Sequence, residues 1–130
     1  MQYEPSAEQL LDAIAELLED DVLAAVPDVL KHRARVAGNL ARILERQEAL
    51  GPAATVRERE RLTALVGTMR GPDRGPDGGD STVELSRQLA QRIRTDDDPD
   101  FQRRAWDALV AICREDLAIA KPGHDAWEGP

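Results

Sequence analysis

Apolar residues recur at helical spacing along most of the chain, and the first such run lies between Ser6 and Val26. Spacings of three and four residues place its large apolar side chains on one stripe: Leu10, Leu11, Ile14, Leu17, Leu18 and Val22. This pattern predicts an amphipathic helix whose stripe faces a core. Ser6 and Gln9 have the spacing of a capping box at its start, and Pro27 ends it.

A second helix is predicted from about Asp28 to Leu50. A valine, isoleucine or leucine recurs along it every seven residues, at positions 29, 36, 43 and 50. Neighbouring leucines and alanines widen the apolar arc to about half of the helix, which is typical of a central helix with more than one neighbour. Gly51-Pro52 is a common helix-ending pair, so we expect the helix to end there.

Three more helices are predicted, and each begins with a capping signal, at Thr55, Ser81 and Asp98. The first of them is short and ends at Gly67, and the last ends at Pro122-Gly123. Between the first and the second of these helices lies "GTMRGPDRGPDGGD", residues 67–80, in which seven of 14 positions are Gly or Pro. This composition predicts a mobile loop, and the segment lacks the Lys-Ser/Thr pair and preceding strand of a phosphate-binding P-loop.

The whole pattern predicts an all-α fold, an antiparallel bundle of four long helices plus one short helix. A length of 130 residues suits a single helical domain over residues 1–130, with a core at about residues 5–66 and 82–122 and a C-terminal tail at 123–130. Hydrophobic residues make up 42% of the chain but aromatic residues only 3%. We therefore expect a core of leucine, isoleucine, valine and alanine.

The same composition bears on location and on cysteine chemistry. No run approaches the roughly 18 consecutive apolar residues of a membrane span, and the first residues lack the pattern of a signal peptide. We therefore expect a cytoplasmic protein that binds no membrane. Cys113, the only cysteine, lies on the apolar stretch of the last predicted helix, where we expect a buried, inert thiol.

Charge is distributed unevenly along the chain, whose net charge is −8. Residues 1–30 hold eight acidic residues and no Lys or Arg, whereas residues 31–50 hold five Lys or Arg and two Glu. An acidic first helix beside a basic second helix would fix their pairing. The overall acidity argues against nucleic-acid binding, which depends on neutralising phosphates.

One edge of the second predicted helix carries Arg35, Arg42 and Arg46, with Asn39 and His32 nearer its apolar stripe. Such an edge could bind a carboxylate or a phosphate, because arginine offers a planar fork of donors. The structural alternative, which we favour, is that these arginines pair with the acidic first helix and otherwise meet solvent.

Asp21 is the acidic residue that a count of 100° per residue places closest to the apolar stripe of the first helix. We predict a structural ion pair between Asp21 and Arg35, with Arg33 as the other candidate partner. Such an ion pair with Asn39 beside it would account for the polar residues on this edge without a bound ligand.

The sequence gives little support for a metal, cofactor or calcium site. Neither His32 nor His124 has a second ligand at metal spacing, so we expect no metal and no cofactor. The acidic run from Asp96 to Asp100 lacks the glycine and terminal Glu of an EF-hand, and capping of the last helix explains it better. Trp106 is most simply a core residue. Trp127, in a Gly/Pro-containing tail, is either bathed in solvent or an interface anchor.

Three stretches together resemble a bacterial family of small helical proteins of unknown function. They are "SAEQLLDAIAELLEDDVLAAV" at residues 6–26, "RVAGNLARILERQEALGP" at 35–52 and "DLAIAKPGH" at 116–124. Members typically show an acidic pair followed by Val-Leu, an Arg-Val-Ala-x-Asn helix closing on Leu-Gly-Pro, and a late Leu-Ala-x-Ala-x-Pro stretch. The likeness covers about residues 5–66 and 82–124, and the Gly/Pro loop departs from it.

The resemblance implies an association rather than an activity. Such proteins are often encoded beside aminoglycoside-phosphotransferase-like kinases and acyl-CoA dehydrogenases, which implies an accessory role with one of these enzymes. The family supplies no catalytic residues. The positions that this sequence shares with it include Asp21, Arg35 and Asn39.

We therefore expect a non-enzymatic helical accessory protein that binds another protein, either a phosphotransferase-like kinase, an acyl-CoA dehydrogenase or its own copy as a homodimer. The alternative is a small-molecule module that binds an acyl or phosphorylated ligand between helices, with Arg35, Asn39 or Arg42 at its mouth. An enzyme is the least favoured class, because no poised acid, base or nucleophile is visible in the sequence.

Overall fold

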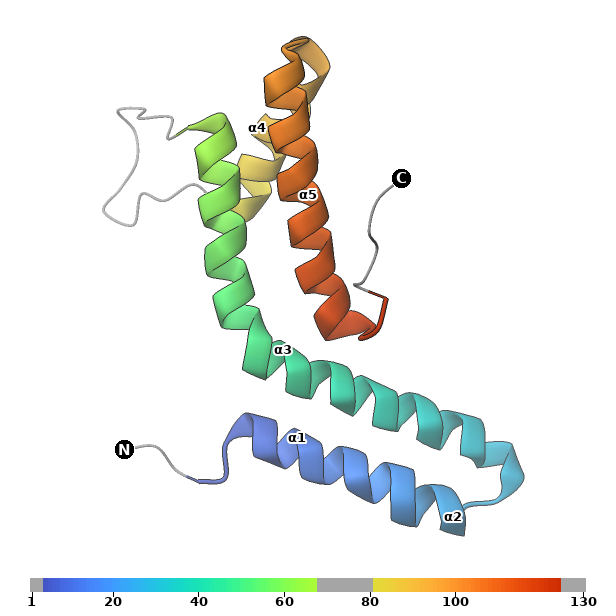
Figure 1. Ribbon diagram of the computed structural model, residues 1–130. Helices are drawn as coiled ribbons and strands as arrows, with labels where there is room; N and C mark the ends of the chain where they lie inside the picture. The colour runs from blue at the N-terminus through green and yellow to red at the C-terminus, as the bar shows by residue number, and fades with distance from the viewer. Residues whose placement is uncertain (1–3, 68–80, 125–130) are drawn as a thin grey trace. The chain divides into compact units, whose positions relative to one another are not determined.

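The computed structural model describes residues 4–67 and 81–124, and within these ranges every regular element is helical (Figure 1). The prediction of an all-α fold is confirmed. In chain order the elements are α1 (Ala7–Glu16), the π-helix η1 (Leu17–Val22), α2 (Leu23–Ala25), α3 (Asp28–Val66), α4 (Thr82–Thr95) and α5 (Pro99–Ala120). The Gly/Pro-rich segment beyond Gly67 and the candidate anchor Trp127 lie outside the described residues.

The local signals that begin the helices act as predicted. At the start of α1 the backbone N–H of Gln9 donates to Ser6 Oγ at 3.2 Å, and the N–H of Ser6 donates to Gln9 Oε1 at 2.8 Å. The N–H of Glu84 donates to Ser81 Oγ at 3.2 Å before α4. These bonds satisfy amides that a helix start leaves without partners.

The helix end predicted at Gly51-Pro52 is wrong, because α3 continues through both residues and reaches Val66. The predicted short helix starting at Thr55 is therefore part of α3, and the count of four long helices plus one short helix is corrected. Gly51 does not adopt the left-handed conformation that ends helices, whereas Gly67 does, with φ 75°. Pro52 costs the helix one hydrogen bond and about 3 kcal/mol, which apolar packing along the rest of α3 offsets.

The chain separates into two compact units, and Pro52 marks their boundary on α3. Of the described residues, unit 1 comprises 4–52 and 117–123, and unit 2 comprises 53–67, 81–116 and 124. The predicted boundary at Gly51-Pro52 thus divides the packing even though it does not end the helix.

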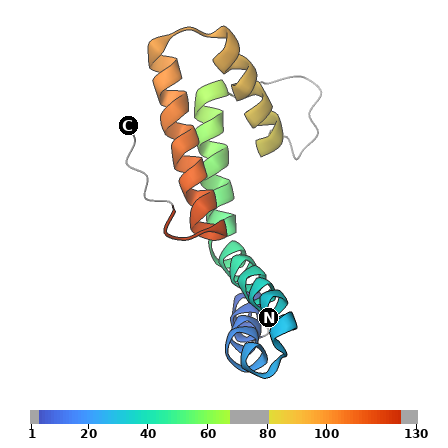
Figure 2. The same cartoon turned by 90° about the vertical axis from the view of Figure 1, so that its right-hand side faces the viewer.

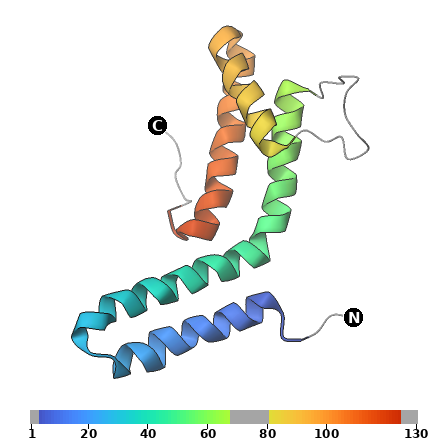
Figure 3. The same ribbon diagram turned by 180° about the vertical axis from the view of Figure 1, so that it is seen from behind.

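In unit 1, the helical run of α1, η1 and α2 lies antiparallel to the first half of α3 (Figures 1 and 3). Small side chains line the seam, with Ala15 fully buried and Ala34 and Ala41 nearly so. A Cβ added to Gly38 would lie 3.1 Å from Glu19 Cγ and 3.7 Å from Leu18 Cβ, so Gly38 lets the helices approach closely. A residue larger than glycine at position 38 would therefore crowd Leu18 and Glu19.

In unit 2, the second half of α3 packs with α4 and α5 (Figure 2). The core of this unit is aliphatic apart from one phenylalanine: Leu62, Leu65, Leu85, Leu89, Phe101 and Ala105. The Arg92 guanidinium lies 4.1 Å from the Phe101 ring centroid and donates to the Leu65 carbonyl at 2.5 Å. Gln102 Nε2 donates to the carbonyls of Ile93 and Asp96 and so caps the end of α4.

Two residues of α5 that we expected to be buried are exposed. Trp106 is 57% exposed, and Cys113 is exposed as well. Core residues of α5 follow Phe101 at positions 105, 108 and 112, and Trp106 lies about 140° around the helix from Phe101. The expectation of a core tryptophan and a buried thiol is therefore wrong.

None of the described helices is long and apolar enough to cross a bilayer.

Candidate functional site

The helix edge singled out from the sequence is the first candidate site, and Arg42 is its best-defined member. The Arg42 guanidinium binds Asp12 of α1, Glu19 Oε2 of η1 at 3.1 Å and Glu45 Oε2 of α3 at 3.2 Å. The pKa of Arg42 is raised, chiefly by its hydrogen bonds to Glu19 and then to Asp12 and Glu45. Three carboxylates therefore occupy this arginine, and its role is to link the two helices of unit 1.

The rest of that edge divides into a second structural contact and three exposed residues. Arg46 Nε donates to the Ile119 carbonyl at 2.6 Å. This bond ties the C-terminal end of α5, which belongs to unit 1, to α3. His32, Arg35 and Asn39 are exposed, and within residues 4–67 and 81–124 none of them forms an ion pair or side-chain hydrogen bond. A ligand-binding role for these three residues stays a prediction.

The ion pair predicted between Asp21 and Arg35 does not form among the described residues, where both side chains are exposed. The acidic helix instead pairs with the basic helix through Arg42. Asp21 lies in η1, a π-helical segment. A π-helical turn holds more residues than an α-helical turn, so a count of 100° per residue misplaces side chains after Leu17.

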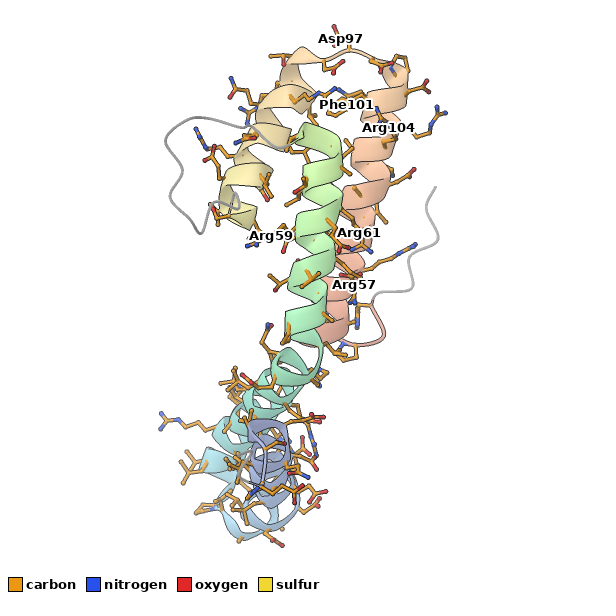
Figure 4. All side chains as sticks on the ribbon, turned by 90° about the vertical axis from the view of Figure 1, so that its left-hand side faces the viewer. Arg57, Arg59, Arg61, Asp97, Phe101 and Arg104 are labelled. Carbon is orange, nitrogen blue, oxygen red and sulfur yellow. The ribbon has the colours of Figure 1, made fainter. Side chains whose placement is uncertain are left out.

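Unit 2 holds a second ion-pair cluster, which the sequence did not indicate. Arg57 and Arg61 lie on the second half of α3 (Figure 4). Arg57 Nε and Arg61 Nη2 both donate to Glu115 Oε1 on α5 at 2.9 Å. The pKa of Glu115 is lowered, chiefly by the hydrogen bond from Arg61, because both cations favour the carboxylate while burial opposes it. The partners lie more than 50 residues apart along the chain, so no local pattern could reveal them.

The acidic run from Asp96 to Asp100 caps the connection between α4 and α5. The N–H of Asp98 donates to Asp96 Oδ1 at 3.1 Å, and the N–H of Asp100 donates to Asp98 Oδ1 at 3.2 Å. The pKa of Asp96 is lowered, first by the Asp98 backbone and then by Arg92. Helix capping therefore accounts for these carboxylates.

Large apolar side chains on the surface of unit 1 form the second candidate site. Leu10 and Ile14 on α1 are 50% and 48% exposed, and Leu40 and Leu44 on α3 are 54% and 53% exposed. We call these four residues the leucine face. The sequence predicted that the apolar stripe of the first helix would be buried. Leu11, Leu18 and Val22 are partly buried, but Leu10, Ile14 and Leu17 are about half-exposed.

Helical geometry places the four side chains along one edge of the hairpin, opposite the Arg42 cluster. Leu10 and Leu44 each lie four residues, or about 40°, from Ile14 and Leu40, so the positions of these two decide the edge. On α1, Ile14 is about 100° from the buried Ala15 in one direction and Asp12 about 60° in the other. On α3, Leu40 is about 100° from the buried Ala41 in one direction and Arg42 about 100° in the other. Because Asp12 and Arg42 are bonded to each other across the seam, Ile14 and Leu40 share the opposite edge.

Unit 1 is thus asymmetric across its seam. One edge is closed by an arginine with three carboxylate partners, and the other presents half-exposed aliphatic side chains from both helices. Exposed apolar side chains gathered on one edge commonly mark protein-binding sites. A patch without hydrogen-bonding groups offers little to a polar ligand.

Comparison with known proteins gives a family but no activity. Searches of curated proteins and of solved structures found no match. Residues 24–124 match a family described as a domain of unknown function, DUF6285, and these residues include α3, α4 and α5. Since this match covers most of the chain, the protein belongs to the DUF6285 family of unknown function.

Proposed function

We propose that the protein is a non-enzymatic accessory protein that acts by binding another protein through the leucine face. One observation carries the proposal: four large aliphatic side chains from two helices of unit 1 stay about half-exposed. Helical geometry places them on one edge of the hairpin. Covering such side chains with apolar atoms of another protein stabilises the complex, because the hydrophobic effect favours removing apolar surface from water.

The two ion-pair clusters of the described residues support a structural rather than a catalytic role for the groups that form them. Arg42, Arg57 and Arg61 each contact carboxylates of another helix, and their partners Asp12 and Glu115 are held in return. Such pairs fix helices against one another. A catalytic acid, base or nucleophile instead needs a free position beside a substrate.

The resemblance noted in the sequence supplies two enzyme classes as partners, an aminoglycoside-phosphotransferase-like kinase and an acyl-CoA dehydrogenase, and the chain itself is the third candidate. The cytoplasm expected from the sequence is the location that we propose.

Pairwise binding assays with purified proteins test the proposal. The labelled chain is titrated with a kinase of this class, with an acyl-CoA dehydrogenase from the same genome, and with its unlabelled self. Leu40→Glu introduces a charge into the leucine face and is expected to weaken whichever complex forms by about 10-fold or more. Val56→Glu is the matched control, because Val56 lies on the same helix, is 57% exposed and belongs to unit 2.

The expected result is loss of binding in Leu40→Glu with binding unchanged in Val56→Glu. Equal binding by the wild type and Leu40→Glu, with circular dichroism showing both folded, would overturn the proposal.

A further inference from the structure

We propose that the occupant of the leucine face is the leucine face of a second copy of this chain, so that two hairpins of unit 1 form a four-helix bundle. This inference rests on the proposed function and names the partner of the same surface. A helical hairpin that buries one seam and presents a second apolar edge is half of such a bundle. A two-fold axis would let one patch cover itself, because each copy presents the same residues to the other.

The dimensions of the hairpin suit this pairing. The helical residues from Ala7 to Ala25 rise about 28 Å, and two helices side by side are about 20 Å wide, which gives a face on the order of 500 Å² in projection. The accessible surface of a layer of side chains exceeds its projection, and a standard interface buries about 800 Å² per partner. The hairpin face is therefore large enough for a small, specific dimer.

The uneven distribution of charge between the two helices of the hairpin favours one orientation of the two copies. The run from Ala7 to Ala25 carries six acidic residues and no Lys or Arg, whereas residues 28–50 of α3 carry five Lys or Arg against three acidic residues. Two arrangements with two-fold symmetry place the hairpins face to face. If the axis is perpendicular to the helices, α1 lies on α1 and like charges meet; if it is parallel to them, α1 of each copy lies on α3 of the other.

The parallel axis is favoured, because it places each acidic helix on a basic one and avoids the repulsion of the alternative. It also puts the two turns that join α2 to α3 at the same end of the bundle. Arg33 is exposed near that turn and lies seven residues before Leu40, so it shares the side of α3 that carries the leucine face. It would meet the turn end of the other copy's acidic helix, where Asp20 and Asp21 are exposed.

Sedimentation equilibrium of the full chain tests the apolar part of this proposal. The wild type is expected to reach the mass of a dimer at chain concentrations up to about 100 μM. Leu40→Glu is expected to raise the dissociation constant by about 10-fold or more, and Val56→Glu to leave it unchanged.

Charge reversal tests the orientation. Arg33→Glu places a negative charge opposite the acidic helix and is expected to weaken the dimer by about 3- to 10-fold at low salt. Combining Arg33→Glu with Asp20→Arg and Asp21→Arg is expected to restore it. Arg35→Glu is the matched control: it makes the same charge change, but Arg35 shares the edge of α3 that carries Arg42, seven residues further on.

The outcomes separate the two proposals. A wild type that stays monomeric at all these concentrations overturns the dimer, and the proposed function survives only if Leu40→Glu abolishes binding to one of the two enzymes. A dimer that Leu40→Glu does not weaken overturns the pairing of leucine faces, and the proposed function then survives on the same condition, that Leu40→Glu abolishes binding to one of the two enzymes. A dimer that Leu40→Glu weakens, but that Arg33→Glu strengthens or affects no more than Arg35→Glu does, overturns the parallel axis.

Discussion

Arg42 is expected to be the polar residue that contributes most to the stability of unit 1, and replacing it with alanine tests this. The substitution removes three ion pairs at once, to Asp12, Glu19 and Glu45. The Asp12 and Glu19 side chains are 47% and 42% exposed, so solvent screens both pairs. At the roughly 0.2–1 kcal/mol that such pairs contribute, the loss amounts to about 1–2 kcal/mol.

Hydrogen exchange of backbone amides measures this loss within unit 1 alone. A loss of about 1–2 kcal/mol accelerates exchange through opening of the unit by roughly 5- to 30-fold. We expect this acceleration for the amides of α1 and of the first half of α3, with α4 and the part of α5 before Leu117 unchanged. At about 1 M salt the Debye length is about 3 Å, so the difference from the wild type is expected to shrink.

Arg35→Ala is the control, because Arg35 lies on the same helix, is exposed and has no ion pair among the described residues. Its effect is expected to stay within about 0.5 kcal/mol. Equal acceleration in Arg42→Ala and Arg35→Ala would refute the reasoning, since the cluster would then contribute nothing beyond an exposed charge.

Four further predictions concern α3 and unit 2. Pro52→Ala restores a backbone donor inside α3 and is expected to raise the free energy of unfolding by up to about 3 kcal/mol, measured in urea; an unchanged midpoint would contradict a helical Pro52. Glu115 has a lowered pKa in the folded protein, so its contribution is complete above its ordinary value of 4.5 and is lost as the pH falls through the lower folded value. Glu115→Gln is therefore expected to lower the melting temperature of the protein at neutral pH and to flatten its fall at acid pH. A plot of melting temperature against pH that runs parallel to that of the wild type would contradict this. Phe101→Ala empties the core and is expected to cost about 3–5 kcal/mol, whereas Trp106→Ala, at a half-exposed position, is expected to cost less than half as much; the two denaturation curves decide this. Cys113 is exposed and is expected to react with a thiol reagent in the native protein as completely as in the unfolded one, whereas protection would place it in a contact.

Local chemistry made the helix starts predictable. Ser6 and Ser81 cap helices because a hydroxyl two or three residues before an orphan amide can reach it, and this depends on a few neighbouring residues alone. The glycine that ends α3 was also found, since Gly67 adopts a positive φ. The coarse fold followed from these signals together with apolar periodicity.

The predictions that were wrong, and the ion pair that was missed, depend on packing or helix geometry that neighbouring residues in the sequence do not reveal. Gly51-Pro52 carries the same two residue types as a true helix end, and only packing on both sides of it keeps α3 intact. The π-helical segment from Leu17 to Val22 rotates the residues after it, so angular counting failed at Asp21. The Arg57–Glu115 pair joins distant parts of the chain, and its charges look like ordinary surface charges in the sequence.

The leucine face illustrates a different limit. The stripe from Leu10 to Val22 indicated an amphipathic helix, but an apolar stripe does not specify what covers it. In the structure the seam of unit 1 uses Ala15, Gly38 and Ala41, and small side chains bring the two helices close enough to leave larger ones at the edge.

The exposure of the Leu40 methyl groups, followed by NMR with a soluble paramagnetic agent while the chain is diluted, tests the leucine face most directly. If this face binds another copy, the Leu40 methyls are shielded at high concentration and become accessible on dilution, while those of buried Leu62 and Leu85 stay shielded throughout. Leu40 methyls that stay accessible at every concentration would contradict the pairing of this face with a second copy.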